Sequence, residues 1–136
     1  MQPRFLLDTN ICIYIRHRQP SEVLARFKRL RPGEAAISVI TYGELLFGAE
    51  KSASRTDALL QLQELAALLP VLDLPQAAAG AYGAIRADLQ AKGEMIGNND
   101  LWIAAHARAA GLILVTNNER EFKRIDGLKL QNWVGR

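Results

Sequence analysis

The sequence predicts an α/β fold in which helices flank a central, mostly parallel sheet of five strands. Short apolar runs rich in β-branched residues alternate along the chain with longer segments whose apolar residues recur at helical spacing, which is the pattern of βα units. The chain has 136 residues, of which 49% are hydrophobic and 23% charged, so it has the size and composition of one globular domain. It shows no internal repeat or linker, and we expect a single domain over residues 1–136.

Five apolar runs have the length and composition of buried strands, the last being the weakest. The expected strands are Arg4–Leu7, Ala35–Ser38, Val71–Leu74, Ile113–Thr116 and Leu128–Gln131.

Amphipathic helices are expected between these strands. Ser21 follows Pro20 and is placed to cap a helix, and Pro75 suits the first turn of another. Glycines mark the ends of two of the helices. The expected helices are Ser21–Leu30, Thr41–Ala49, Arg55–Leu69, a segment from Pro75 to Gly93 and a segment from about Asn99 to Gly111.

Composition excludes several classes of protein. The single cysteine, Cys12, allows no disulfide framework. The apolar run near the start of the sequence is too short for a signal peptide or a membrane span, so we expect a cytoplasmic protein. The net charge of +3 is compatible with a polyanionic partner but does not require one. Basic residues crowd one early stretch, which would attract phosphates or form a solvated helix face: Arg16, Arg18, Arg26, Lys28, Arg29 and Arg31.

Three acids follow predicted strands, at the sheet edge where sites gather in open parallel sheets. Asp8 closes the first strand, Glu44 lies one or two turns into the helix after the second, and Asp100 begins a later helix. Each also has a structural interpretation: Asp8 as a helix cap, Asp100 as a complement to a helix dipole, and Glu44 as a solvated residue. Glu44 stands among apolar neighbours and beside Gly43, a poor helix former, which favours a functional reason for it.

Oxygen ligands from three segments would together suit Mg²⁺ or Mn²⁺. Acids brought close together repel one another, so such a cluster is stable mainly when a cation neutralises it. The chain offers one cysteine and only two histidines, His17 and His106, so the ligand types disfavour zinc. We expect His106 to be a packing or surface residue.

Five segments form a pattern through their order and spacing. They are Leu7-Asp8-Thr9-Asn10; Ile40-Thr41-Tyr42-Gly43-Glu44-Leu45 with Gly48; Ile96-Gly97 followed by Asp100-Leu101-Trp102-Ile103-Ala104-Ala105-His106-Ala107; Leu114-Val115-Thr116-Asn117-Asn118 with Phe122; and Gly127-Leu128-Lys129-Leu130-Gln131-Asn132-Trp133. Together they resemble the PIN-domain toxins called VapC, from bacterial toxin–antitoxin pairs, over nearly the whole chain.

The resemblance implies a PIN-like fold and a metal-dependent endoribonuclease whose acids correspond to Asp8, Glu44 and Asp100. Many relatives carry a further aspartate after the last-but-one strand, where this chain has Asn117 and Asn118. That difference leaves open whether one or two metal ions are held.

Supporting roles are expected for five residues near these acids. Asn118 would hold a water or a ligand carboxylate, and Glu121 would be a substitute ligand. Thr9, Asn10 and Thr116 would orient the acids, although turn and cap chemistry explains all three as well.

The resemblance also implies an RNA substrate, a homodimer and a VapB-type antitoxin. We expect tRNA as the target, with the initiator tRNA anticodon loop cut by some relatives, and inhibition of translation as the effect. Other members of the family cut ribosomal RNA or mRNA, and the residues of this chain do not choose among these targets. Tyr14, Tyr42 and Trp102 are candidate stacking platforms or core residues. The antitoxin would lie in a groove between the helices over residues 21–30 and 41–49, with apolar residues that core packing would also explain: Val23, Leu24, Phe27, Leu46 and Phe47.

Two other functions fit parts of the sequence. Phosphatases that form an aspartyl-phosphate also begin with an aspartate after the first strand, but they usually have an acid two residues on, where this chain has Asn10. A degenerate PIN-fold module that binds RNA without cleaving it is the non-enzymatic alternative. Retention of all three acids argues against it, because a cluster of negative charge gains nothing for binding a polyanion.

Overall fold

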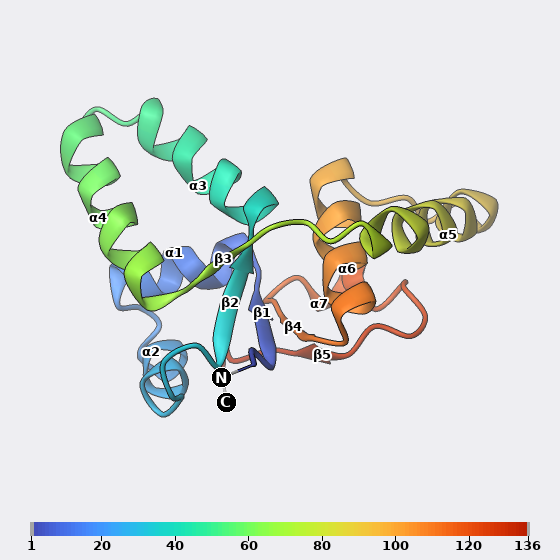
Figure 1. Ribbon diagram of the computed structural model, residues 1–136, viewed down its shortest axis with the longest axis horizontal. Helices are drawn as coiled ribbons and strands as arrows, with labels where there is room; N and C mark the ends of the chain where they lie inside the picture. Colours follow the sequence, from blue (N-terminus) through green and yellow to red (C-terminus); the bar gives the residue numbers. More distant parts are fainter. Residues whose placement is uncertain (1, 136) are drawn as a thin grey trace.

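A computed structural model describes residues 2–135; Met1 and Arg136, the two ends of the expected domain, lie outside the described residues. Strands and helices alternate along the chain as the sequence predicts (Figure 1). In chain order the elements are β1 Phe5–Leu7, α1 Thr9–His17, α2 Ser21–Lys28, β2 Ala35–Ser38, α3 Val39–Glu50, α4 Arg55–Leu68, β3 Val71–Leu72, α5 Ala77–Lys92, α6 Asn98–Ala110, β4 Ile113–Val115, α7 Glu119–Phe122 and β5 Leu130–Gln131.

The five strands form one sheet in the order β3-β2-β1-β4-β5, and every neighbouring pair is parallel. The central strand β1 is buried along its whole length, because helices cover both faces of the sheet. Its register pairs Phe5 with Ala35 on one side and with Ile113 on the other. The carboxyl ends of β1, β2 and β4 therefore lie at one edge, where loops and helix starts follow each strand.

Two hydrophobic clusters, one on each side of the sheet, hold the helices in place. One lies beneath α1 to α4 and includes Trp133, which is fully buried and meets Phe5 edge to face, with 5.7 Å between ring centroids. The other lies beneath α5 and α6, where the small side chains of Ala104 and Ala105 let α6 approach the sheet closely. Burial on both faces explains why the strand sequences are almost continuously apolar.

Several boundaries differ from the prediction. All the strands except β2 are shorter than expected, although Arg4, Thr116 and Lys129, just outside the strand ends, still form backbone hydrogen bonds with neighbouring strands. Ser21 is the first helical residue of α2 and Pro20 is its cap, so the expectation of a serine cap is wrong. Pro75 precedes α5, whose first turn is entered through hydrogen bonds that Pro75 and Gln76 accept.

Two helices, α1 and α7, were not predicted from the sequence. The buried residues of α1, Ile11, Cys12 and Ile15, do recur at helical spacing, but the helix has only nine residues, fewer than the window over which a helical period is read. Helix α7 spans a single turn, which is too short for a periodic pattern. Along residues 2–135, no helix combines the length and the hydropathy needed to cross a membrane.

Candidate active site

Asp8 stands at the carboxyl end of β1, where the chain turns into α1. It is the N-cap of that helix, and its Oδ1 accepts a hydrogen bond of 2.8 Å from the backbone N–H of Thr9. Its Oδ2 accepts a second bond of 2.8 Å from the hydroxyl of Thr116, at the end of the neighbouring strand β4. The side chain is only 5% exposed, so both oxygens are held in fixed directions. Capping and a place in the acidic site are therefore two roles of one residue.

Glu44 lies on the second turn of α3, a helix that starts directly from β2 with Ser38 as its cap. The hydroxyl of Thr9 donates a hydrogen bond of 2.6 Å to Glu44 Oε1. Asn99 Nδ2 lies 3.5 Å from Glu44 Oε2, which links α3 to the start of α6. Thr9 thus connects the acids of the first and second βα units. Its backbone N–H donates to Asp8 and its side-chain hydroxyl donates to Glu44.

Asp100 is the third residue of α6 and is partly buried. The turn before it is closed by the Leu101 N–H bonding to the carbonyl of Gly97, the cap of the helix. A Cβ added at Gly97 would lie 3.6 Å from Asp100 Oδ2, so the missing side chain leaves this carboxylate open to its surroundings. The position matches the prediction that an acid begins this helix.

A fourth carboxylate, Glu121, comes from α7. Asn118 Nδ2 donates a hydrogen bond of 2.9 Å to Glu121 Oε2, and the Asn118 N–H donates one of 2.9 Å to the hydroxyl of Thr116. Because that hydroxyl in turn binds Asp8, one polar network connects the loop after β4 to the end of β1. Asn118 therefore holds the side chain of Glu121, as its expected supporting role required.

The electrostatics show that the acids share one region of negative potential. Partial burial raises the pKa of Asp100 to about 6, and the negative charges of Asp8, Glu44 and Glu121 add to the rise. Burial also raises the pKa of Asp8 above its ordinary value, helped by the charge of Glu44 and opposed by the hydrogen bonds from Thr116 and Thr9. All four acids were singled out from the sequence, Asp8, Glu44 and Asp100 as ligands and Glu121 as a substitute ligand, and they influence one another because parallel strands bring their ends together.

Two hollows open beside Glu44. The first, of about 360 Å³, is lined by Glu44 and by residues 97–100. The second, of about 650 Å³, lies between α1 and α3, where Thr9 and the 66% exposed Phe47 are among its lining residues. Asn98 and Asn99 line much of the first hollow. We did not predict them as site residues from the sequence, although a pair of polar residues directly before Asp100 could have indicated them.

Other predicted residues lie outside this network. Asn10 is exposed and makes no side-chain hydrogen bond within the described part of the chain, so nothing ties it to the acids. Tyr14 accepts a hydrogen bond of 3.3 Å from Asn117, and Tyr42 packs on the core. His106 is 1% exposed and burial lowers its pKa, which fits the expected packing role.

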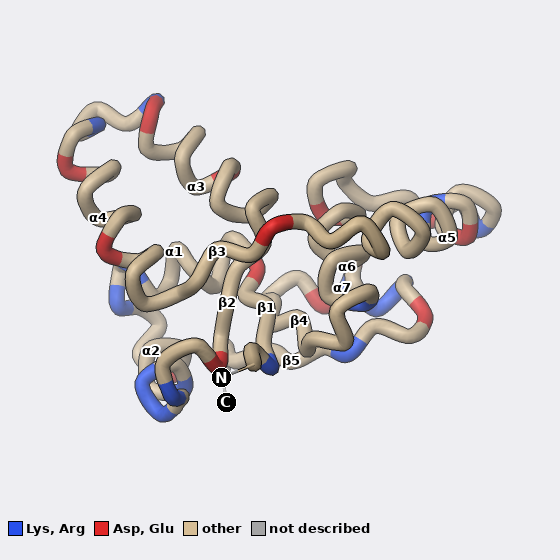
Figure 2. Tube along the Cα trace, viewed as in Figure 1, with Lys and Arg blue, Asp and Glu red and all other residues tan. Residues whose placement is uncertain are grey.

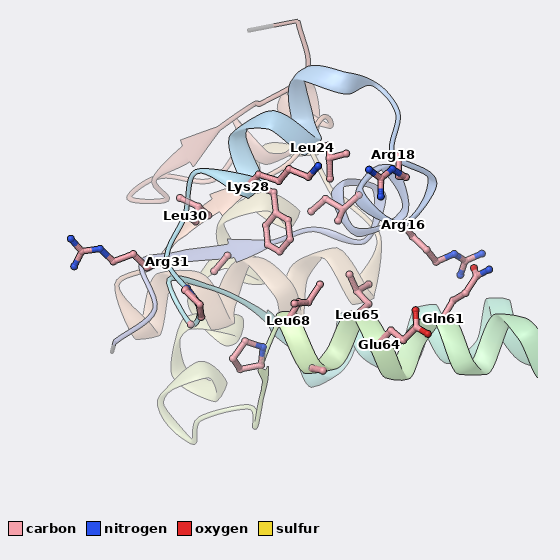
Figure 3. A pocket seen from close by; sticks show the side chains of 17 residues that line it. Arg16, Arg18, Leu24, Lys28, Leu30, Arg31, Gln61, Glu64, Leu65 and Leu68 are labelled. Atoms are coloured by element: carbon pink, nitrogen blue, oxygen red, sulfur yellow. The ribbon is translucent and has the colours of Figure 1, made fainter.

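A larger hollow of about 800 Å³ lies on the opposite flank, between the end of α1, α2 and α4 (Figure 3). Basic side chains surround apolar ones there, consistent with the blue segments around α2 in Figure 2. The groove was expected between the helices predicted over residues 21–30 and 41–49, but α4, not α3, forms the wall of this hollow facing α2, because the C-terminal end of α4 returns to the side of α2. Val23 is fully buried, while Leu24 and Phe27 do line the hollow.

The chain matches the PIN domain family over residues 5–128. Ribonuclease VapC2 from Haemophilus influenzae is 44% identical over 131 residues, which cover 96% of this chain and 98% of that protein. The tRNA(fMet)-specific endonuclease VapC from Shigella flexneri is 45% identical over 130 residues, covering 96% and 98% of the two chains.

Solved structures agree with these sequence relationships. A chain of the DNA-bound VapBC complex from Salmonella typhimurium superposes with a TM-score of 0.91 at 42% identity, covering 97% of this chain and 99% of that one. A chain of VapBC2 from Rickettsia felis, bound to a promoter DNA fragment, gives 0.88 at 39% identity, with 95% and 98% covered. The protein therefore belongs to the VapC branch of the PIN-domain family, as the motif pattern predicted.

Proposed function

We propose that the protein is a divalent-metal-dependent endoribonuclease, the toxin of a VapBC-type pair acting in the cytoplasm. The observation that carries the proposal is the gathering of Asp8, Glu44, Asp100 and Glu121 at one sheet edge, where the charges of the other three acids add to the rise in the pKa of Asp100 that burial causes. A cluster that raises the proton affinity of its own members binds cations for the same electrostatic reason.

The donor set fits Mg²⁺ in its chemistry, since it offers carboxylate oxygens and no sulfur or imidazole. Across residues 2–135, no three Asp, Glu, His or Cys side chains already stand in the arrangement of metal ligands, so an ion would draw Asp100, whose carboxylate makes no side-chain hydrogen bond there, toward Asp8 and Glu44. Asp8, Glu44 and Asp100 would hold the ion, with Glu121 as an additional ligand, and Mn²⁺ would substitute for Mg²⁺. The ion supplies a water of lowered pKa and charge stabilisation for an in-line displacement at phosphorus.

The residues around the acids prepare the site. Thr116 and the Thr9 backbone fix both oxygens of Asp8, and the Thr9 hydroxyl fixes one oxygen of Glu44. A carboxylate of the site would also accept the proton of the attacking water, and Asp8 or Asp100 would serve. Because water rather than the ribose 2′-OH attacks and the ribose 3′-oxygen leaves, the products carry 5′-phosphate and 3′-hydroxyl ends.

The proposed substrate is tRNA. Two relatives, from Shigella flexneri and Salmonella typhimurium, are named tRNA(fMet)-specific endonucleases and are 45% and 42% identical to this chain. The initiator tRNA anticodon loop is therefore the first site to examine, and cutting it would inhibit translation.

The proposed partner is a VapB-type antitoxin, supported by the VapBC complexes among the similar structures. The hollow between α2 and α4 suits an amphipathic, acidic segment of such a partner, because four basic residues and one acid surround apolar side chains. Figure 3 shows most of these residues; the rim is Arg16, Arg18, Lys28, Arg31 and Glu64, and the apolar part includes Leu24, Phe27, Leu65 and Leu68. We also expect the free toxin to be a homodimer, which light scattering would establish.

The direct test is incubation of the purified chain with total tRNA in Mg²⁺, Mn²⁺ or EDTA, with Asp8→Asn as the paired control. Discrete fragments with 5′-phosphate ends, absent with EDTA and with the variant, are the expected result. Ends carrying 2′,3′-cyclic phosphate would refute the mechanism. Binding of RNA without cleavage under any cation would instead establish the degenerate-module alternative.

A further inference from the structure

Helices α5 and α6 lie side by side (Figure 1). A series of polar contacts crosses between them beside the acidic hollow. Tyr82 of α5 stacks on Trp102 of α6, with 3.9 Å between ring centroids and 13° between ring planes. The Tyr82 hydroxyl lies 2.5 Å from Asn98 Oδ1 and 2.6 Å from a guanidinium nitrogen of Arg86. Because the stack fixes the plane of the tyrosine ring, it also fixes where the hydroxyl can reach.

The chemistry of Arg86 determines which group donates and which accepts in each of these hydrogen bonds. Arg86 has only donors, so the oxygen of the Tyr82 hydroxyl must accept from it. The hydroxyl hydrogen is then left to donate to Asn98, which must present its carbonyl oxygen to Tyr82. The remaining hydrogen-bonding group of the Asn98 side chain is its NH₂, which carries two donors and faces away from the tyrosine.

Asn98 lines the same 360 Å³ hollow as Glu44 and Asp100, and its side chain is exposed there. Asn99, the other amide of that wall, directs its Nδ2 to Glu44. An approaching RNA phosphate meets two carboxylates in this hollow and needs a neutral or positive donor to offset them. The free N–H groups of Asn98 are placed to supply it.

We propose that Asn98 is a substrate-binding residue that donates a hydrogen bond to a backbone phosphate of the RNA, and that Tyr82, held by Arg86 and Trp102, is the positioning residue that turns the amide toward the substrate. This assignment rests on the proposed ribonuclease function, because it concerns the hollow that contains Glu44 and Asp100. A hydrogen bond to a charged phosphate increases affinity about tenfold. Correct orientation of the Asn98 amide by Tyr82 contributes only part of that increase.

The test is a double-mutant cycle of RNA binding in EDTA, measured by fluorescence anisotropy with a labelled tRNA anticodon stem-loop. Asn98→Ala should weaken binding about tenfold. Tyr82→Phe keeps the stacked ring and removes the hydroxyl. It should weaken RNA binding about threefold in the otherwise intact protein, but it should not weaken binding further in a protein that already carries Asn98→Ala. Gln90→Ala is the matched control for the amide, since Gln90 is exposed near the end of α5 and makes no side-chain hydrogen bond within residues 2–135, and it should bind as the intact chain does.

Kinetics provide a second readout. In cleavage of the same RNA, Tyr82→Phe should raise KM with little change in kcat, because the carboxylates are untouched. Equal losses from Tyr82→Phe in both backgrounds, or undiminished binding by Asn98→Ala, would overturn the assignment while leaving cleavage of tRNA by the intact chain as evidence for the nuclease. If the intact chain neither binds nor cleaves RNA, the proposed function fails and this assignment fails with it.

Discussion

Replacing Asp100 by asparagine should make the metal-free protein more stable while it abolishes cleavage. Burial and the charges of Asp8, Glu44 and Glu121 raise the pKa of Asp100 from an ordinary 3.8 to about 6. That difference of about 2 units corresponds to roughly 3 kcal/mol at 1.36 kcal/mol per unit, and partial exposure of the carboxylate reduces it to about 1–2 kcal/mol. Asparagine has similar shape and no charge, so it removes this repulsion.

The pH dependence gives the sign of the effect. Between pH 4 and 6 the unfolded chain loses the Asp100 proton while the folded chain keeps it, so the free energy of unfolding falls as pH rises through this window. At pH 8 Asp100→Asn should therefore have a melting temperature roughly 3–6 °C above that of the intact chain, and near pH 4 the two should coincide.

Thermal denaturation in EDTA at both pH values measures this difference. Asp57→Asn is the control, because Asp57 is an exposed acid in the first turn of α4 and should give no gain. Adding Mg²⁺ should stabilise the intact chain more than Asp100→Asn. A lower melting temperature for Asp100→Asn at pH 8, or the same difference at pH 4 and 8, would show that the acids do not repel one another as the structure indicates.

Three further predictions follow from the site and the groove. Thr116→Val removes the hydroxyl that binds Asp8 Oδ2 and should lower the free energy of unfolding by about 1–3 kcal/mol in urea titrations, with most cleavage lost; unchanged stability would mean that this bond is replaced by water. Thr9→Val should reduce cleavage at least tenfold with little effect on folding, whereas Thr9→Ser should retain it, because only the serine keeps a donor for Glu44. Leu68→Asp, at a 60% exposed groove position, should weaken antitoxin binding in calorimetry and leave cleavage intact; undiminished binding would place the partner elsewhere.

Much of the fold could be predicted because local pattern and burial agree. Strands such as Ala35–Ser38 are apolar throughout since both faces of the sheet are covered, and the predicted helices carry their apolar residues on the inner side. Helix α1 was missed because its nine residues carry only one short repeat of buried residues, Ile11, Cys12 and Ile15, and its first residue, Thr9, bonds to Glu44 of the acidic cluster. The sequence at the start of α1 is therefore constrained by the acidic site as well as by core packing.

The three acids were predictable because the rule that parallel strands end at one edge needs only the order of elements. The network around them was only partly predictable. Thr9 and Thr116 could be named from their neighbours in sequence, whereas the contact of Asn99 with Glu44 depends on how α6 is placed beside α3. The groove was assigned to the wrong second helix for the same reason: the packing direction of α4 is a tertiary property that no local spacing encodes.

The central claim is that carboxylates from three distant segments form one cation site, and Mn²⁺ binding followed by electron paramagnetic resonance tests it most directly. The purified chain should bind Mn²⁺ near neutral pH, Mg²⁺ should displace it, and Asp8→Asn and Asp100→Asn should each lose most of the affinity while Asp57→Asn keeps it. If the two site variants bind Mn²⁺ as tightly as the intact chain, these acids do not form the metal site and the proposed mechanism is contradicted.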